Sequence, residues 1–308
     1  MRGWAALYVV FYHFAVGYNI YLPASILWFE MAGYSGVEFF FVLTGYLLAT
    51  LYSSTTAKYF IRRVFRTFPL YYAMFVPYVL LGLTAATPLY FIYAQDYFPS
   101  AMIFSNPLWT LCIEELFYFV VFPLILIISH HVIRIKVHWL VFVGIIISIA
   151  WCALPLPIYA LVEQIPTFFI CYAVGIMISR VNLGKRLETN KFIWIIPTAL
   201  FFGCAFALTR IVPPVCFEAI LWSVVYGMVI LFMKDARFFT NKISHFLGKI
   251  SYGVYIIQGP VMWMARGWYY PYGIFISVGA TIVLATLSYY LFEKRLVDFG
   301  HRITSNMR

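Results

Sequence analysis

Apolar runs of roughly membrane-spanning length recur along almost the whole chain, separated by short polar or proline-containing joints. A spanning helix needs about 20 mostly apolar residues, and proline and glycine tend to mark the turns between helices. Ten segments meet this measure, and they are 3–22, 36–53, 67–86, 107–129, 138–154, 166–180, 192–209, 215–233, 250–267 and 271–292. We therefore expect an all-α fold, a polytopic membrane protein with about ten transmembrane helices.

The composition supports the same class. Of 308 residues, 64% are hydrophobic and only 10% are charged, whereas soluble domains carry about 25% charged residues. The polar joints are too short to form a separate globular unit. We expect residues 1–308 to form a single transmembrane domain with no appended soluble domain.

The basic residues report on topology. A net charge of +10 could indicate a nucleic-acid partner, but the 21 lysines and arginines are scattered in short runs between apolar segments. Sorting them by alternate loops places 19 on the side of both termini and leaves two, Arg210 and Arg266, on the other side. Cytoplasmic loops carry an excess of Lys and Arg. Both termini are therefore predicted to be cytoplasmic, with a lipid bilayer and no nucleic acid as partner.

The five cysteines lie in or beside apolar stretches, without a CxxC pair or a histidine at metal-ligand spacing. Free cysteines often behave as small buried hydrophobic residues. We expect neither a disulfide nor a metal site.

Ionisable residues inside the apolar segments are the candidates for chemistry. Each costs about 2.5–3.5 kcal/mol near the bilayer centre, so it is a functional hypothesis by default. The candidates are His13, Glu38, Glu114 and Glu115. Taken singly, His13 is also explained as a neutral imidazole bound to a backbone carbonyl, and Glu114 as a protonated carboxyl joining two helices.

Two spacings in the sequence make His13 and Glu114 stronger candidates for a functional site. Arg2 and His13 are eleven residues apart, just over three helical turns, and therefore fall on nearly the same helix face. That spacing places His13 about 16 Å along the axis from Arg2, and Glu114 lies about 10 Å from the outer end of its own helix. We expect these two residues to lie at similar depth and to approach each other. Glu115 is rotated by about 100° from Glu114.

A cluster of arginines stands at one membrane edge, in the stretch YFIRRVFRTFPLYY. Arg62 and Arg66 are one turn apart on one face, and Arg63 lies between them in sequence. Such a cluster anchors topology and attracts anionic lipid headgroups. It is also suited to a phosphate clamp, because guanidinium groups match phosphate oxygens in pairs.

Five motifs in order resemble the acyltransferase type 3 family of integral-membrane acyltransferases. The motifs are the Arg2–His13 pair, GVEFFFVLTGYLL (36–48), RRVFRTFPLYY (62–72), NPLWTLCIEELFYFVVFP (106–123) and LGKISYGVYIIQGPV (247–261). The fourth motif identifies Glu114, rather than Glu115, as the family's glutamate. Two departures stand out: Met1 directly precedes Arg2 where relatives have a short acidic lead-in, and Gln258 stands where His is common.

The resemblance implies transfer of an acyl group, usually acetyl, from cytoplasmic acyl-CoA to a hydroxyl of an extracytoplasmic carbohydrate such as exopolysaccharide or O-antigen. It implies a multi-pass protein of the bacterial inner membrane, with acyl-CoA as co-substrate and no permanently bound cofactor. His13 is the expected general base, with Glu114 orienting it. The CoA phosphates are expected on Arg62, Arg63 and Arg66, assisted by Arg2. Candidates for acceptor contacts or structural roles are Glu38, Trp109, Tyr118, Tyr255 and Gln258.

Two other classes remain open on the residues alone. A secondary transporter or flippase also has many spans and a few buried polar groups, although paired repeats are more typical of it. A sensor or scaffold needs no matched histidine and glutamate. Direct transfer and a covalent acyl-enzyme are both compatible with the sequence, and neither the acceptor nor the oligomeric state is predicted by it.

Overall fold

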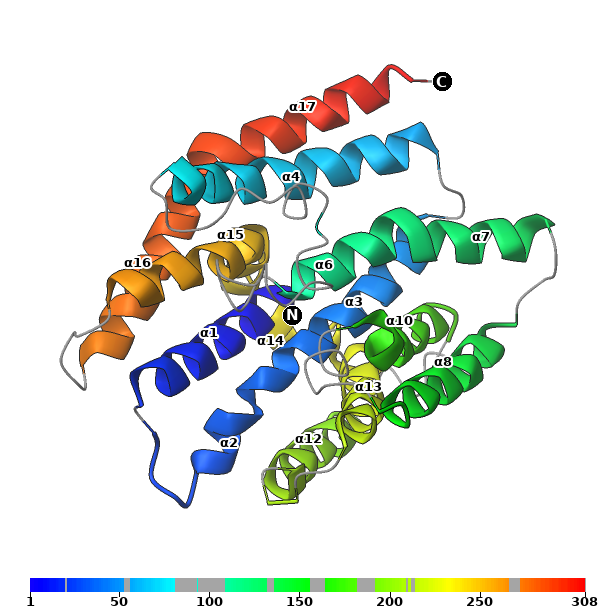
Figure 1. Cartoon of the computed structure of the whole chain (residues 1–308), viewed down its shortest axis with the longest axis horizontal. Coiled ribbons are helices and arrows are strands. Elements are labelled where there is room, and N and C mark those ends of the chain that lie inside the picture. Colours follow the sequence, from blue (N-terminus) through cyan, green and yellow to red (C-terminus); the bar gives the residue numbers. More distant parts are fainter. Residues whose placement is uncertain are drawn as a thin grey trace. The chain divides into compact units, whose positions relative to one another are not determined.

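The computed structural model describes residues 1–19, 21–52, 56–80, 93, 109–131, 136–155, 164–181, 192–208, 210–211, 214–265 and 272–307. Over these residues the regular structure is entirely helical (Figure 1). The chain divides into two compact units. The first comprises Met1–Leu51 with Arg134–Gly248, and the second comprises Tyr52–Ile133 with Lys249–Arg308.

The first unit is built around helices of both its segments. They are α1 (Arg2–Tyr18), α2 (Leu27–Met31), the 3₁₀ turn η1 (Ala32–Ser35), α3 (Gly36–Leu51), α8 (Val137–Cys152), α10 (Ile165–Ile178), α12 (Ile195–Leu208), α13 (Val215–Met233), α14 (Arg237–Thr240) and the first residues of α15 (Lys242–Met264). The second unit holds the remainder of α15 with α4 (Ala57–Leu80), α6 (Trp109–Leu116), α7 (Phe122–His131), α16 (Tyr272–Ser288) and α17 (Lys294–Ser305). Two π-helical turns, η5 (Phe117–Val121) and η6 (Tyr289–Glu293), join α6 to α7 and α16 to α17.

Each of the ten segments expected from the apolar pattern contains a helix. Within the described parts, four helical stretches are long and apolar enough to cross a membrane: Leu27–Leu51, Trp109–His130, Val215–Met233 and Tyr272–Ser305. Three further apolar helices are shorter, namely α8, α10 and α12. Parts of the expected segments lie outside the described residues, namely 20, 53, 81–86, 107–108, 209, 266–267 and 271. The count of ten spans and the cytoplasmic termini stay predictions.

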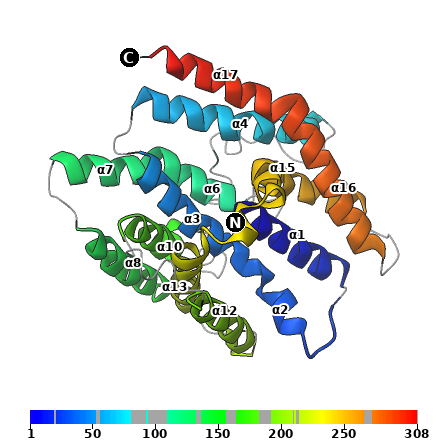
Figure 2. The ribbon, with the colours of Figure 1, turned by 180° about the vertical axis from the view of Figure 1, so that it is seen from behind.

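Helix α10 forms the centre of the first unit. It is apolar all round, as expected of a helix with neighbours on every side, and it packs against α3, α8 and α13 (Figures 1 and 2). Where α10 crosses α3, the backbones of the two helices are in direct contact. A Cβ added at Gly45 would lie 2.3 Å from the Tyr172 carbonyl oxygen, and one at Gly175 would lie 2.0 Å from the Val42 carbonyl oxygen. Glycine at both positions allows this approach, as at many membrane helix pairs.

Helix α1 runs antiparallel to the α2–η1–α3 segment in a fixed register. A Cβ at Gly33 would lie 2.6 Å from Tyr12 Cβ, a Cβ at Gly36 would lie 2.5 Å from Val9 Cγ2, and Arg2 stands over the Phe40 ring. Arg2 is thus level with the middle of this segment, about 16 Å along the axis from the end of α3 at residue 51. The depth of Arg2 and His13 in a bilayer stays a prediction.

In the second unit, α17 lies along α4 in both ribbon views (Figures 1 and 2). A Cβ at Gly300 would lie 2.8 Å from Phe65 Cβ, so the two helices approach closely. The sequence pattern predicts no helix after residue 292. Helix α17 was missed because its charged residues lower the mean hydropathy of the segment.

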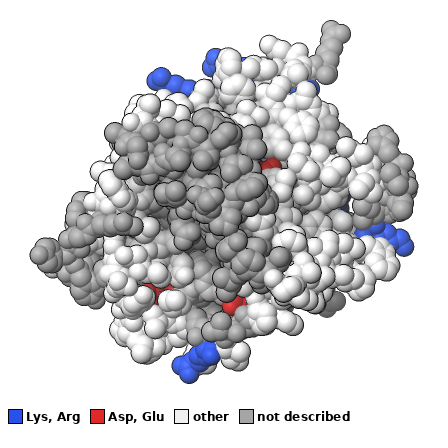
Figure 3. Space-filling model, viewed as in Figure 1, with Lys and Arg blue, Asp and Glu red and all other residues white. Residues whose placement is uncertain are grey.

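Large apolar side chains are exposed on both units. Trp139 on α8 is 54% exposed and Phe275 on α16 is 73% exposed. Figure 3 shows one face with few charged side chains among the described residues. Extensive exposed apolar surface marks membrane contact, which agrees with helices of membrane-spanning length and composition.

Candidate active site

The polar face of α1 carries Arg2 and His13. Because α1 is one unbroken α-helix from Arg2 to Tyr18, the two side chains project from nearly the same face, as the spacing predicts. The Arg2 guanidinium carbon lies 5.8 Å from the centroid of the Phe40 ring. His13 is half-buried, and its ring centroid lies 5.5 Å from that of Tyr12. The structure therefore confirms the shared face, while the roles of both residues stay predictions.

Glu38 lies at the start of α3 beside a band of buried polar groups. Its side chain is buried, and its Oε2 atom has no hydrogen-bond partner among the described residues. The band includes two hydrogen bonds between η1 and α13. One joins Ser35 Oγ and Tyr226 Oη at 2.5 Å, and in the other Trp222 Nε1 donates to Tyr34 Oη over 3.2 Å. A buried carboxylate oxygen without a donor is costly, so this position has the capacity to bind a hydroxyl.

Glu114 belongs to a polar stripe in the second unit. Thr110, Glu114 and Tyr118 follow at four-residue intervals and share one face of α6–η5. The Tyr118 hydroxyl donates to Glu114 Oε1 over 2.7 Å. The Thr110 hydroxyl and the Tyr255 hydroxyl of α15 are hydrogen-bonded at 2.6 Å. The carboxyl group is therefore held by a side chain of its own helix, one turn away.

Arg63 packs against the same stripe from α4. Its guanidinium carbon lies 4.6 Å from the Tyr118 ring centroid, 5.7 Å from that of Tyr52 and 5.9 Å from that of Tyr59. This geometry is that of a cation–π contact. The Tyr59 hydroxyl donates to the Tyr118 carbonyl over 2.7 Å. Burial raises the pKa of Tyr59, so the phenol keeps the proton that it donates. Tyr118 itself lies within η5, and such π-helical turns are frequent at functional sites.

Arg62 and Arg66 occupy another face of α4 and have other partners. Arg62 Nε donates to Thr304 Oγ1 of α17 over 2.9 Å. Arg66 interacts electrostatically with Glu293 of η6, whose Oε1 accepts a hydrogen bond from Ser288. The three arginines expected as one cluster are thus divided: Arg63 turns toward Tyr118, and the other two turn toward the η6–α17 segment.

The remaining candidates extend the stripe. Gln258 is buried on α15, and its Nε2 atom donates to the Tyr255 carbonyl over 3.0 Å. Trp109 begins α6, half-buried, one residue before Thr110. Glu115 is buried on the same helix as Glu114. Tyr255 is therefore hydrogen-bonded to both Thr110 and Gln258. These three residues lie in the second unit, together with Glu114.

The expected residues fall into two groups, one in each unit. Arg2, His13 and Glu38 lie in the first, and the others lie in the second. The expected pairing of His13 with Glu114 joins residues of different units and stays a prediction.

Sequence reasoning missed two buried acidic residues. Glu30 is 1% exposed, and its Oε2 accepts from the Leu22 backbone N–H over 2.6 Å. Glu293 is 7% exposed within η6. Each is a single acidic residue next to aromatic and aliphatic neighbours, in WFEM and YLFE. Both lie outside the ten expected segments, and their apolar flanks are the signal that could have found them.

Comparisons with known proteins identify the family. A family model described as an acyltransferase domain matches residues 1–293. A protein of Acidianus two-tailed virus, whose name proposes an acetyltransferase, is 29% identical over 279 residues, which cover 83% of this chain and 80% of that protein. No solved structure matches. Because the family match spans nearly the whole chain and four described helices are long and apolar enough to cross a membrane, this protein belongs to the acyltransferase type 3 family of membrane acyltransferases.

Proposed function

We propose that this protein transfers an acetyl group from cytoplasmic acetyl-CoA to a hydroxyl of a carbohydrate outside the plasma membrane. The observation that carries the proposal is α1, which holds a cation and an imidazole on one face of an unbroken helix in a chain of acyltransferase type. The family accounts for acyl transfer. The acetyl donor, the carbohydrate acceptor and a bacterial inner membrane as location are our proposals.

Arg62 and Arg66 are proposed to bind the phosphates of CoA. They lie one turn apart on one face of α4, a spacing at which two guanidinium groups reach neighbouring phosphates. Arg2 is proposed to contact the same donor from α1. Arg63 was expected to bind phosphate as well. Its contacts with Tyr118 favour a different role, in which it positions the stripe that contains Glu114.

The proposed chemistry needs one base and one carboxylate. His13, neutral in its apolar surroundings, removes the proton of the acceptor hydroxyl. The hydroxyl oxygen attacks the thioester carbonyl carbon, the carbon–sulfur bond breaks, and the CoA sulfur leaves with the proton returned by the imidazolium. Glu114 is the second catalytic residue, proposed to stabilise that imidazolium as the third member of a triad does. Direct transfer is the simplest sequence of steps.

The first test replaces the proposed base. His13→Ala is expected to lower O-acetylation of cell-surface carbohydrate, and CoA release by the purified protein supplied with acetyl-CoA and crude polysaccharide, by about 10²–10⁴-fold. His138→Ala, on an exposed position of α8, is the matched control and should retain both activities at equal membrane levels. Wild-type activity of the His13 variant would overturn the assignment. CoA release also separates the proposal from a transporter, which predicts none.

The second test concerns the donor site. The double variant Arg62→Gln/Arg66→Gln is expected to raise the KM for acetyl-CoA at least tenfold while the protein stays folded. Arg302→Gln removes one exposed charge from α17 and serves as the control. An unchanged KM in the double variant would place the CoA phosphates elsewhere.

A further inference from the structure

An apolar cavity of about 680 Å³ lies within the first unit, lined by residues of α1, α2, α3, α12, α13 and α14. Ligand pockets typically measure about 300–1,000 Å³, so this one is large enough for part of a small molecule. Its wall on α1 runs from Met1 through Trp4 and Tyr8 to Phe11. The ten helical steps from Met1 to Phe11, at 1.5 Å each, give the cavity a length of about 15 Å.

On α1, the cavity wall faces away from the proposed catalytic residues. At 100° per residue, Trp4, Tyr8 and Phe11 point roughly 160° away from Arg2 and His13 around the α1 axis. The same helix therefore presents its polar face on one side and the cavity on the other. A molecule in the cavity does not occupy the proposed donor path along α1.

Among the described residues, the side chains of the cavity wall offer no free N–H or O–H group. Four of its lining side chains carry a polar atom, and each atom is already bonded within the unit. Trp4 Nε1 donates to Ser244 over 2.8 Å, the Tyr8 hydroxyl donates to the Phe29 carbonyl, the Thr198 hydroxyl donates to the Trp194 carbonyl over 2.8 Å, and the Tyr226 hydroxyl pairs with Ser35. The wall thus favours a hydrocarbon chain over a sugar or a nucleotide.

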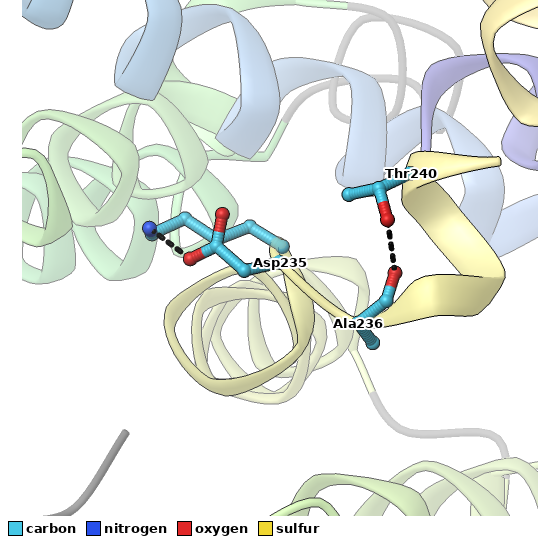
Figure 4. Close-up of polar contacts among 4 residues, drawn as sticks. Asp235, Ala236 and Thr240 are labelled. Carbon is cyan, nitrogen blue, oxygen red and sulfur yellow. Dashed lines mark hydrogen bonds and ion pairs between the residues drawn. The ribbon is translucent and has the colours of Figure 1, made fainter. Parts of the chain in front are cut away.

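One end of the cavity is bordered by basic residues. Phe238 lines the cavity beside the start of α1, where its ring stacks on Trp4, and Met233 lines it as well. The exposed Lys234 and Arg237 adjoin these two residues in sequence, and the exposed Lys242 follows α14. Asp235 pairs with Lys234 at 2.5 Å (Figure 4). Arg237 and Lys242 then give the segment an excess of positive charge. The same figure shows the Thr240 hydroxyl donating to the Ala236 carbonyl over 3.2 Å, across the short helix α14. Basic residues at a membrane surface attract anionic lipid headgroups.

We propose that the cavity binds one acyl chain of an anionic phospholipid, with the headgroup at the basic segment 234–242. The hydrocarbon of one leaflet is half of about 30 Å, which matches the length of the cavity. The positive-inside pattern predicts that segment 234–242 lies on the cytoplasmic side, where anionic lipids are available. The bound lipid supports α1 from behind its polar face.

The cavity arm of the test counts lipids. Full-length protein is incorporated into nanodiscs of phosphatidylcholine with or without phosphatidylglycerol, and retained lipids are measured by native mass spectrometry. The wild type is expected to retain one phosphatidylglycerol that Val229→Trp and Thr198→Trp lose, since both replacements fill the cavity. Val224→Trp makes the same change on α13 at a position that is 50% exposed and outside the cavity lining, and should retain the lipid. Retention by both cavity variants would overturn the proposal.

The headgroup arm tests the charge. Arg237→Gln/Lys242→Gln is expected to reduce the preference for phosphatidylglycerol over phosphatidylcholine at least fivefold, whereas Arg302→Gln leaves it unchanged. Equal retention of both lipids by the wild type would overturn the anionic assignment. Helical content and melting temperature are compared among all variants. No acyl donor is present, so the outcome does not depend on the proposed transferase activity.

Discussion

Two buried glutamates, Glu38 on α3 and Glu114 on α6, differ in how the protein surrounds them. Both lie within stretches long and apolar enough to cross a membrane. Glu114 Oε1 accepts a hydrogen bond from Tyr118, whose ring in turn packs under Arg63. Glu38 Oε2 has no donor among the residues that the structure describes. The first carboxyl group is positioned by its own unit, and the second retains the capacity to accept a hydrogen bond from a ligand.

This difference separates two roles within the proposed reaction. A carboxylate held by fixed neighbours suits a catalytic group, because its geometry is set before substrate arrives. A buried carboxylate oxygen that lacks a donor gains most from a ligand hydroxyl, which removes the cost of its burial. We infer that Glu114 acts on the chemical step and that Glu38 binds the acceptor. Changes at the two residues should therefore affect different kinetic constants.

The largest effect is expected at Glu114. Glu114→Gln removes the charge but keeps an oxygen that accepts from Tyr118, and loss of such a catalytic group lowers kcat by about 10²-fold or more. The measurement is CoA release at saturating acetyl-CoA and polysaccharide. Asp298→Asn, an exposed carboxylate-to-amide change on α17, is the control. A kcat within threefold of wild type would remove Glu114 from the mechanism.

The same variant tests the pairing that the sequence predicts. If Glu114 acts through His13, the double variant His13→Ala/Glu114→Gln should be no slower than His13→Ala alone, because residues that work as a unit are non-additive. Independent action predicts that the two losses multiply. Single-turnover rates at saturating substrates distinguish the two outcomes.

Glu38→Gln is expected to have the next largest effect, and on binding. Leaving a buried hydrogen-bonding partner unsatisfied costs about 1–3 kcal/mol, so the KM for the polysaccharide acceptor should rise about tenfold or more. The kcat and the KM for acetyl-CoA should stay within twofold of wild type. A loss confined to kcat would show that Glu38, like Glu114, acts on the chemical step. It would overturn the inference that Glu38 binds the acceptor.

Tyr118→Phe tests whether the protein's own hydrogen bond matters to Glu114. It deletes the donor while keeping the ring under Arg63, and a hydrogen bond of this kind contributes about 1.5 kcal/mol. We expect kcat to fall about fivefold to tenfold with both KM values unchanged. Tyr59→Phe removes the neighbouring bond to the Tyr118 carbonyl and is the matched control, with less than a twofold effect. Equal losses in both variants would indicate a general packing defect.

The apolar pattern predicted much of the fold. Segment 215–233 coincides with α13, because a continuous apolar run between proline and lysine leaves little choice of ends. Helix α4 begins ten residues before the expected 67, since charged residues lower hydropathy without breaking a helix. The register of α1 on α3 depends on contacts at Gly33 and Gly36, which are distant in sequence from Val9 and Tyr12.

The site was predicted residue by residue rather than as a network. The motifs identified Glu114, Tyr118, Tyr255 and Gln258, but not that Thr110 bonds Tyr255 or that a π-helical turn begins at residue 117. The residue types around position 117 do not predict a π-helical turn, because such a turn depends on how neighbouring helices pack. Glu30 was missed because it lies in a short helix between two expected spans.

Arg63→Lys has the smallest expected effect. It tests whether Arg63 positions the Glu114 stripe while Arg62 and Arg66 bind the CoA phosphates. Lysine keeps the charge but loses the planar group that stacks on the Tyr118 ring, a contact of about 0.5–2 kcal/mol. If Arg63 positions the Glu114 stripe, kcat should fall twofold to threefold while the KM for acetyl-CoA is unchanged. Arg62→Lys, on the other face of α4, is the matched control and should raise that KM instead. A tenfold rise in the KM for acetyl-CoA with Arg63→Lys would return Arg63 to the phosphate site, because stacking on Tyr118 has no direct effect on the affinity for a phosphate group.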